Sequence, residues 1–122
     1  MTQASLTNSP LWNQIVGEDL SAVSFIRDYV RFEFNAPLMI DVLSTVTLTT
    51  PIGTAKFGDP TFATLALQMI GSVVQGVRIE PGETFAIDFI GWSSIQISLQ
   101  SKDCIGPEAV VFHGRNQQFG II

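Results

Sequence analysis

The chain of 122 residues contains one cysteine and one histidine. Cys104 alone cannot form an intramolecular disulfide, and with His113 as the sole histidine the sequence has no cluster of zinc or iron–sulfur ligands. We therefore expect no metal and no other cofactor. Because disulfides are typical of oxidising compartments, this use of cysteine is compatible with the cytoplasm, which we predict as the location.

Charged residues are also scarce. They make up 14% of the chain, and 11 Asp and Glu outnumber 6 Lys and Arg to give a net charge of −5. Six scattered cations are too few to neutralise a run of phosphates, so binding to nucleic acid is not expected. With so few charges, the surface must be rich in Ser, Thr, Gln and Asn, which suggests that another chain covers part of it.

Long apolar runs are absent as well. No stretch approaches the ~18 residues of a membrane span, so we expect no membrane association. Residues 1–8 lack the positive charge and apolar core of a signal peptide, and their patternless polar sequence predicts a flexible arm. The apolar content of 46% excludes intrinsic disorder. The remaining residues, 9–122, have the length of a single domain.

Two helices are predicted from caps and apolar spacing. A short one begins with Ser9 as N-cap and Pro10 in the first position, and Gly17 ends it in the left-handed conformation. A long one spans residues 60–75, after Asp59 as cap, and Gly76 ends it. Its apolar residues recur at spacings of three and four, namely Phe62, Leu65, Ala66, Met69, Ile70, Val73 and Val74.

Strict alternation predicts the strands. Residues 22–34 form a hairpin that turns near Arg27 and Asp28, and a long third strand follows from Leu38 to Thr49. Residues 50–58 are assigned to a loop. Later strands lie at 77–79, 84–89, 94–100 and 109–112. The predicted fold class is α+β: an antiparallel sheet of five or six strands, the long helix packed on one face, and the short N-terminal helix at one end.

The apolar C-terminal segment, residues 119–122, would promote aggregation if it were exposed. We therefore expect it to be buried, either against its own sheet or against that of a second copy. A sheet with one helix also leaves an uncovered edge. Burying both the tail and the edge in a two-fold dimer solves both problems, and two-fold dimers are the most common oligomers.

No catalytic constellation stands out. A Cys104–His113 nucleophile pair was weighed against the ordinary structural role of an isolated Cys and an isolated His. Five residues are candidates for binding, each with a structural alternative such as a turn aspartate, a strand tyrosine or a tryptophan folded over the core. They are Asp28 and Tyr29 in the hairpin, Asp88 opposite an apolar face, Trp92 in a glycine turn, and His113 next to Gly114-Arg115.

One pattern is similar to known sequences. The string Trp12-x-x-Ile15-Val16-Gly17-x-x-Leu20-Ser21-x-Val23-x-Phe25-x-x-Asp28-Tyr29, with Ile70-Gly71 and Gly106-Pro107-Glu108-Ala109 further on, resembles a group of short bacterial proteins of unknown function. The resemblance extends from Trp12 to about Phe112. It implies a bacterial protein and assigns no catalytic residue.

These observations favour a non-enzymatic bacterial interaction protein that acts as a homodimer or binds another protein. Its acidic balance suits a basic partner, such as a nuclease toxin. The alternative is a small-molecule-binding domain or a modest enzyme with a pocket between helix and sheet, lined by Tyr29, Asp88, Trp92 and His113. Convergence of these four side chains on one cleft would favour the alternative, and their scatter over the surface would favour the interaction protein.

Overall fold

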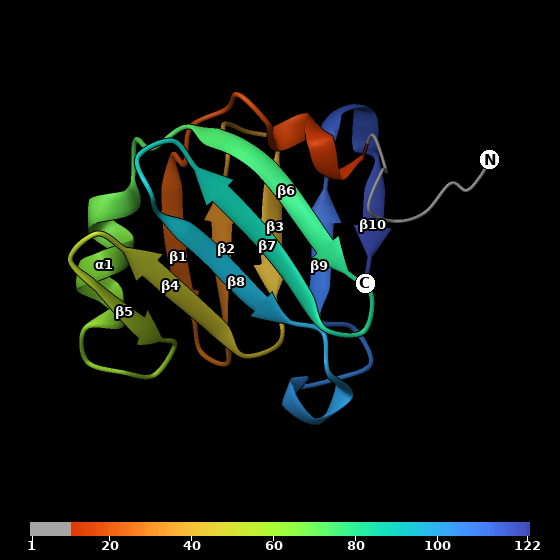
Figure 1. Cartoon of the computed structure of the whole chain (residues 1–122). Coiled ribbons are helices and arrows are strands. Elements are labelled where there is room, and N and C mark those ends of the chain that lie inside the picture. Colours follow the sequence, from red (N-terminus) through yellow and green to blue (C-terminus); the bar gives the residue numbers. More distant parts are fainter. Residues whose placement is uncertain (1–10) are drawn as a thin grey trace.

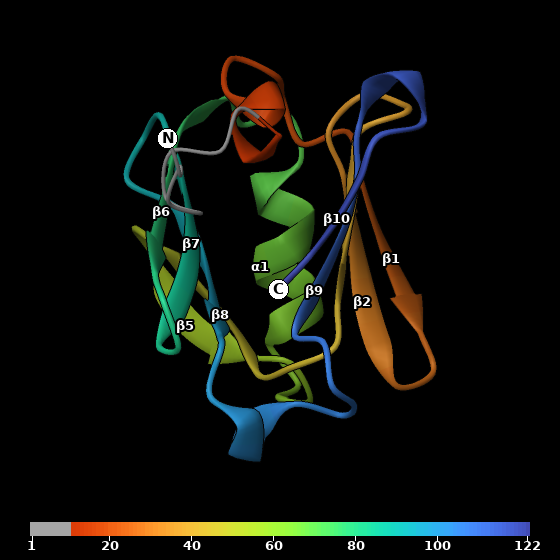
Figure 2. The same ribbon diagram turned by 90° about the vertical axis from the view of Figure 1, so that its right-hand side faces the viewer.

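The computed structural model describes residues 11–122, which form two antiparallel five-stranded sheets packed face to face (Figures 1 and 2). The strand order is β1-β2-β3-β9-β10 in the first sheet and β5-β4-β8-β7-β6 in the second. The prediction of one sheet beneath a long helix is therefore wrong. The described chain is mostly antiparallel β-structure, and its one α-helix is short.

The first sheet is built from both halves of the chain. Its strands are β1 (Ala22–Ile26), β2 (Tyr29–Glu33), β3 (Met39–Val42), β9 (Val110–His113) and β10 (Phe119–Ile121). The second sheet comes from the middle of the chain. Its strands are β4 (Val46–Thr50), β5 (Gly53–Lys56), β6 (Val74–Glu80), β7 (Thr84–Phe89) and β8 (Ser94–Ser98). The helical elements among residues 11–122 are η2 (Trp12–Ile15), α1 (Phe62–Met69), η3 (Ser101–Asp103) and η4 (Arg115–Gln117), of which only α1 is an α-helix.

The predicted hairpin is confirmed. β1 pairs with β2 in the register that places Phe25 opposite Val30, and Arg27 and Asp28 form the turn between the strands. The strands predicted at 84–89 and 94–100 are also present as β7 and β8, and they pair with each other.

The predicted third strand is two strands in different sheets. β3 pairs with β2 in the first sheet, whereas β4 pairs with β5 and β8 in the second. Ile40 and Leu48 are both buried because alternate residues face the space between the sheets in either strand. The alternation therefore continues unchanged where residues 43–45 cross over. The segment assigned to a loop contains β5.

The predicted long helix ends six residues early. α1 stops at Met69, Ile70 is extended, and Gly71 has a φ of +97°. The Gly71 N–H donates to the Leu20 carbonyl at 2.8 Å, so the backbone leaves the helix to pair with an earlier segment. Val74, which fits the helical spacing, instead begins β6. A helix followed directly by a strand imitates a longer helix because both bury regularly spaced apolar side chains.

The two helices close the open margins of the sandwich and do not cover a sheet face. α1 lies along one side of the two layers and buries Phe62, Leu65, Ala66 and Met69 (Figure 2). The predicted N-terminal helix is present as the 3-10 turn η2, which Gly17 follows with a φ of +87°. Its proposed cap residues, Ser9 and Pro10, lie outside the described residues, as does the predicted arm 1–8.

The C-terminal segment joins its own sheet, because β10 pairs with β9. Ile122 packs against the core. Phe119 and Ile121 lie on the outer face of the first sheet and are 56% and 49% exposed. The prediction that the segment is buried against its own sheet is therefore wrong for these two side chains.

Replacing Gly71 tests the stop signal of α1. An added Cβ would meet no atom within 4 Å, so the left-handed backbone is the only obstacle. We expect Gly71→Ala to lower the free energy of unfolding by about 1–2 kcal/mol. Gly76→Ala is the control, because Gly76 is equally uncrowded and has no left-handed φ. It should be neutral or stabilising by about 0.5 kcal/mol in urea denaturation. Equal losses for the two variants would contradict this explanation.

Candidate functional site

Exposed apolar side chains gather at one end of the molecule, where the β4–β5 turn, α1 with the loop that follows it, and the β7–β8 turn lie together (Figure 1). Six of the eleven large hydrophobic residues that are exposed among residues 11–122 belong to these segments. We name this surface the apolar end. Its residues are Ile52, Leu67, Ile70, Val73, Ile90 and Trp92.

Direct contacts join the three segments. The N–H of Ile90 in the β7–β8 turn donates to the carbonyl of Val73 at 2.9 Å. Ile52, Met69 and Ser93 line one small hollow of about 190 Å³, so the β4–β5 turn, α1 and the β7–β8 turn are neighbours. The apolar end is therefore one continuous surface.

The apolar end is built from stretches of sequence that carry no charge. Residues 42–55, 60–77 and 89–101 contain no Asp, Glu, Lys or Arg. Of the six residues, only Trp92 is among those predicted from the sequence. The lack of charge in the three stretches is the signal that the sequence offers for the others, since an exposed surface without charge is unusual, but the meeting of the stretches depends on the fold.

Trp92 has the most unusual conformation of the apolar end. Its side chain is 88% exposed, so the alternative that it folds over the core is wrong. Its φ is +75° and that of Gly91 is +103°, and the Phe89 N–H closes the turn on the Ser93 carbonyl at 2.9 Å. A bulky residue in the left-handed region is strained by about 1–2 kcal/mol. Strain of this kind, held at an exposed aromatic residue, is typical of functional sites.

A groove of about 530 Å³ runs beside Trp92, and Asp88 lines it together with Gln75, Ser93 and Ser94. The structure therefore brings together two of the five predicted residues. The Asp88 carboxylate is already engaged, because Arg78 donates to it from Nε at 2.5 Å and from Nη2 at 3.0 Å. This hydrogen bond raises the pKa of Arg78. The groove thus presents an exposed indole and hydroxyl groups next to a neutralised ion pair.

Asp28 lies in the β1–β2 turn and Tyr29 begins β2, so both belong to the first sheet, whereas Asp88 and Trp92 belong to the β7–β8 hairpin of the second sheet. Asp28 lines a second hollow of about 420 Å³ with Lys56, Asp59 and Asp103. Two carboxylates of this hollow are already engaged. Asp59 accepts a hydrogen bond from the Lys56 backbone N–H at 2.8 Å, and Asp103 accepts one from the Ser98 hydroxyl at 2.6 Å.

His113 lies on the outer face of the first sheet. Its Nε2 is 3.4 Å from Asp41, which also accepts two hydrogen bonds from Arg31 at 2.6 and 3.1 Å. Asp41 is the one charged residue that is buried among residues 11–122, and its hydrogen bond raises the pKa of Arg31. The ring of His113 also packs edge-on against Phe119, with centroids 5.6 Å apart. This cluster ties β2, β3 and β9 together.

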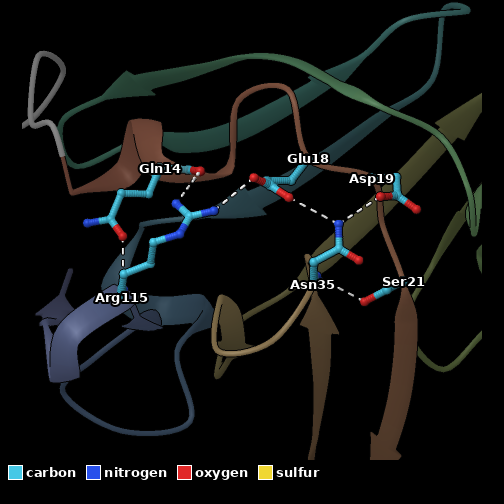
Figure 3. Close-up of polar contacts among 6 residues, drawn as sticks. All are labelled: Gln14, Glu18, Asp19, Ser21, Asn35 and Arg115. Atoms are coloured by element: carbon cyan, nitrogen blue, oxygen red, sulfur yellow. Dashed lines mark hydrogen bonds and ion pairs between the residues drawn. The ribbon is translucent and has the colours of Figure 1, made fainter.

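A further polar network joins residues 14–21 to the connection between β2 and β3 and to η4 (Figure 3). Arg115 donates to Glu18 at 2.8 Å, and Asn35 donates to Glu18 at 3.1 Å and to Asp19 at 2.7 Å. Gln14 accepts the Arg115 N–H at 2.9 Å. These groups satisfy one another, which indicates a structural clamp.

The described residues show no assembled catalytic or metal centre. The Cys104 thiol donates to the Gln100 carbonyl at 3.4 Å, whereas His113 faces Asp41. No three His, Cys, Asp or Glu side chains between residues 11 and 122 gather as a metal site requires. In the same range, no helix has the length and apolar character to cross a membrane.

Comparisons with protein-family models, curated proteins and solved structures find no match for the chain. The resemblance to short bacterial proteins stays a prediction.

The two Arg–Asp pairs have similar geometry and different surroundings, which makes them a matched test. The Asp41 side chain is 12% exposed and that of Asp88 is 31% exposed. We expect Asp41→Ala to cost about 1–3 kcal/mol, because it leaves Arg31 half-buried without its partner. Asp88→Ala should cost under about 1 kcal/mol, as an exposed pair does. Thermal and urea unfolding measure both, and equal costs would contradict the assignment of Asp41 as a structural residue.

Proposed function

We propose that the chain is a non-enzymatic interaction protein that binds another protein through the apolar end. The observation that carries this proposal is Trp92, which is 88% exposed and held in a left-handed backbone conformation. The backbone conformation destabilises the free protein, and the exposed indole contributes almost no burial to offset that strain. Their combination is understandable if a partner covers the indole.

The chemistry of the apolar end supports a protein partner. The cores of protein interfaces are depleted of charge, as this surface is, and enriched in aromatic residues. Tryptophan is also among the residues that most often dominate binding energy, when it fills a pocket from which water is excluded. We infer that the partner offers an apolar recess for Trp92, with contacts for Ile90 and Ile52 around it. The net charge of −5 favours approach by a basic partner.

The scatter of the predicted residues supports the same proposal. Asp88 and Trp92 share a groove, whereas Tyr29 and His113 lie on the other sheet. Small-molecule binding remains the second candidate, because the groove beside Trp92 has the volume of a ligand site. It is less well supported, since the Asp88 carboxylate already binds Arg78.

Trp92→Asn separates strain from function. Asparagine tolerates the left-handed conformation, and little burial is lost at so exposed a position. We expect the free energy of unfolding to rise by about 0.5–1 kcal/mol, while partner binding is lost. Urea denaturation checks the first expectation. A destabilised variant would show that the indole supports the fold, and the argument from strain would then fail.

Ile90 and Ile105 provide a matched pair for detecting the partner, because both side chains are 62% exposed and only Ile90 belongs to the apolar end. A photo-crosslinking residue is placed at position 90 or 105 in the full chain, in the cells that produce it. We expect position 90 to capture one protein in a fixed ratio, and position 105 not to capture it. The product should disappear when Trp92→Asn is added.

Three outcomes of this experiment count against the proposal. They are the same products at both positions, a product at position 90 that survives Trp92→Asn, and no protein product at all. If the last outcome came with a metabolite-induced rise in Tm that Trp92→Asn abolishes, it would favour the small-molecule function.

A further inference from the structure

The two sheets have four edge strands, β1, β5, β6 and β10. Charged side chains and irregular pairing protect an edge from joining another strand. β5 carries Lys56, and β6 carries Arg78 and Glu80. The register of β6 is also interrupted between Val74 and Gly76. These two edges are therefore poor templates for a further strand.

Aromatic residues next to and within α1 pack against β1. Phe25 stacks on Phe57 and meets Phe62 edge-on, with centroids 6.3 and 6.0 Å apart. β10 has neither form of protection within the described chain. Residues 116–122 contain no charged side chain, and β9 is the one strand between residues 11 and 122 that β10 pairs with.

The outward backbone groups of β10 follow from its hydrogen bonds to β9. Ile122 and Val110 exchange N–H···O bonds of 3.0 and 3.2 Å, and the Gly114 N–H donates to Gln118 at 2.9 Å. Alternate residues of an antiparallel strand face the same neighbour. Gln118, Gly120 and Ile122 therefore face β9. The N–H and C=O groups of Phe119 and Ile121 face away from it, at the edge.

We propose that β10 pairs with β10 of a second copy of the chain, antiparallel, across a two-fold axis at Gly120. Phe119 and Ile121, whose backbone groups face outward, lie on either side of Gly120. An axis at Gly120 therefore places Phe119 opposite Ile121 of the second copy. All four outward backbone groups of each strand then form hydrogen bonds. An axis at Phe119 instead places Ile121 opposite Gln117 of the second copy, and Gln117 has a φ of +63° and lies outside the strand. The first sheets of the two copies become one ten-stranded sheet.

Side chains and charge favour a second copy as the occupant of this edge. Phe119 and Ile121, both about half exposed on the outer face, become cross-strand neighbours in this register. Each chain carries a net charge of −5, which opposes self-association, so the contact that adds least repulsion is one without charged side chains. The segment 116–122 meets this condition. Gly120 lies close to Leu11 and Trp12 on its inner side, so a second copy cannot approach it from there.

This inference does not rest on the proposed function. β10 and the apolar end lie on opposite sides of the molecule (Figure 1). A dimer through β10 therefore leaves both apolar ends open, and each surface is tested by its own variants.

Static light scattering of the full chain over a range of concentrations tests the dimer. We expect a mass near twice 13.3 kDa that falls on dilution. Ile121→Pro removes an N–H that faces away from β9, so the bonds within the sheet remain while the dimer is weakened at least tenfold. Ile121→Thr keeps that N–H and should retain the dimer. A wild-type mass of 13.3 kDa at every concentration would overturn the proposal. So would a dimer that survives Ile121→Pro and is lost in Ile90→Ser.

Hydrogen exchange on the unmodified chain tests the register even if the proline variant does not fold. The amides of Phe119 and Ile121 should be protected, and their protection should increase with protein concentration. The amides of Gly120 and Ile122 should be protected at every concentration, because they belong to the bonds with β9. Fast exchange at Phe119 and Ile121 in the most concentrated sample, with Gly120 protected, would show an unpaired edge and overturn the proposal.

Discussion

Contact between the two apolar sheet faces is the interaction on which every other feature depends. The first sheet contributes Phe32 and Phe112, the second contributes Phe85 and Ile87, and all four side chains are fully buried. Trp12 lies between the layers, and its ring centroid is 5.3 Å from that of Phe85 and 5.2 Å from that of Phe112. Burial of one such side chain stabilises a protein by about 1.5–3 kcal/mol. A core of this size tolerates local strain at Trp92, and it holds the turns of the apolar end in fixed positions.

The alternation of apolar residues predicts which side chains are buried and says little about which strands pair. Ile40 and Leu48 obey one continuous period of two, and both are buried. They nevertheless belong to different sheets. The inner faces of both sheets of a sandwich bury alternate residues, so the alternation does not show to which sheet a strand belongs. The prediction of one long helix from the spacing of Phe62 to Val74 was wrong for a related reason. Gly71 ends the helix, and the next apolar residues serve a strand.

The candidate site could be predicted only where it is local in sequence. Asp88 and Trp92 are brought together by a single turn, so their shared groove follows from the hairpin. The cluster of Arg31, Asp41 and His113 requires the pairing of β2, β3 and β9, which no single stretch of sequence shows. The apolar end is less local still, since three separate segments meet there. The left-handed conformation of Trp92 has no sequence signal beyond its position after Gly91.

The order of the strands along the chain has a consequence for synthesis. The second sheet is contiguous, from Val46 to Ser98, whereas the first sheet is interrupted between β3 and β9. Asp41 and His113, which face each other in the finished sheet, are 72 residues apart. Closing a loop of that length costs about 4 kcal/mol in chain entropy. While a chain grows from its N-terminus, β3 has an unpaired inner edge until β9 has been made. If synthesis stopped after Ser98, the second sheet would be complete, and β3 of the first sheet would still lack its partner β9.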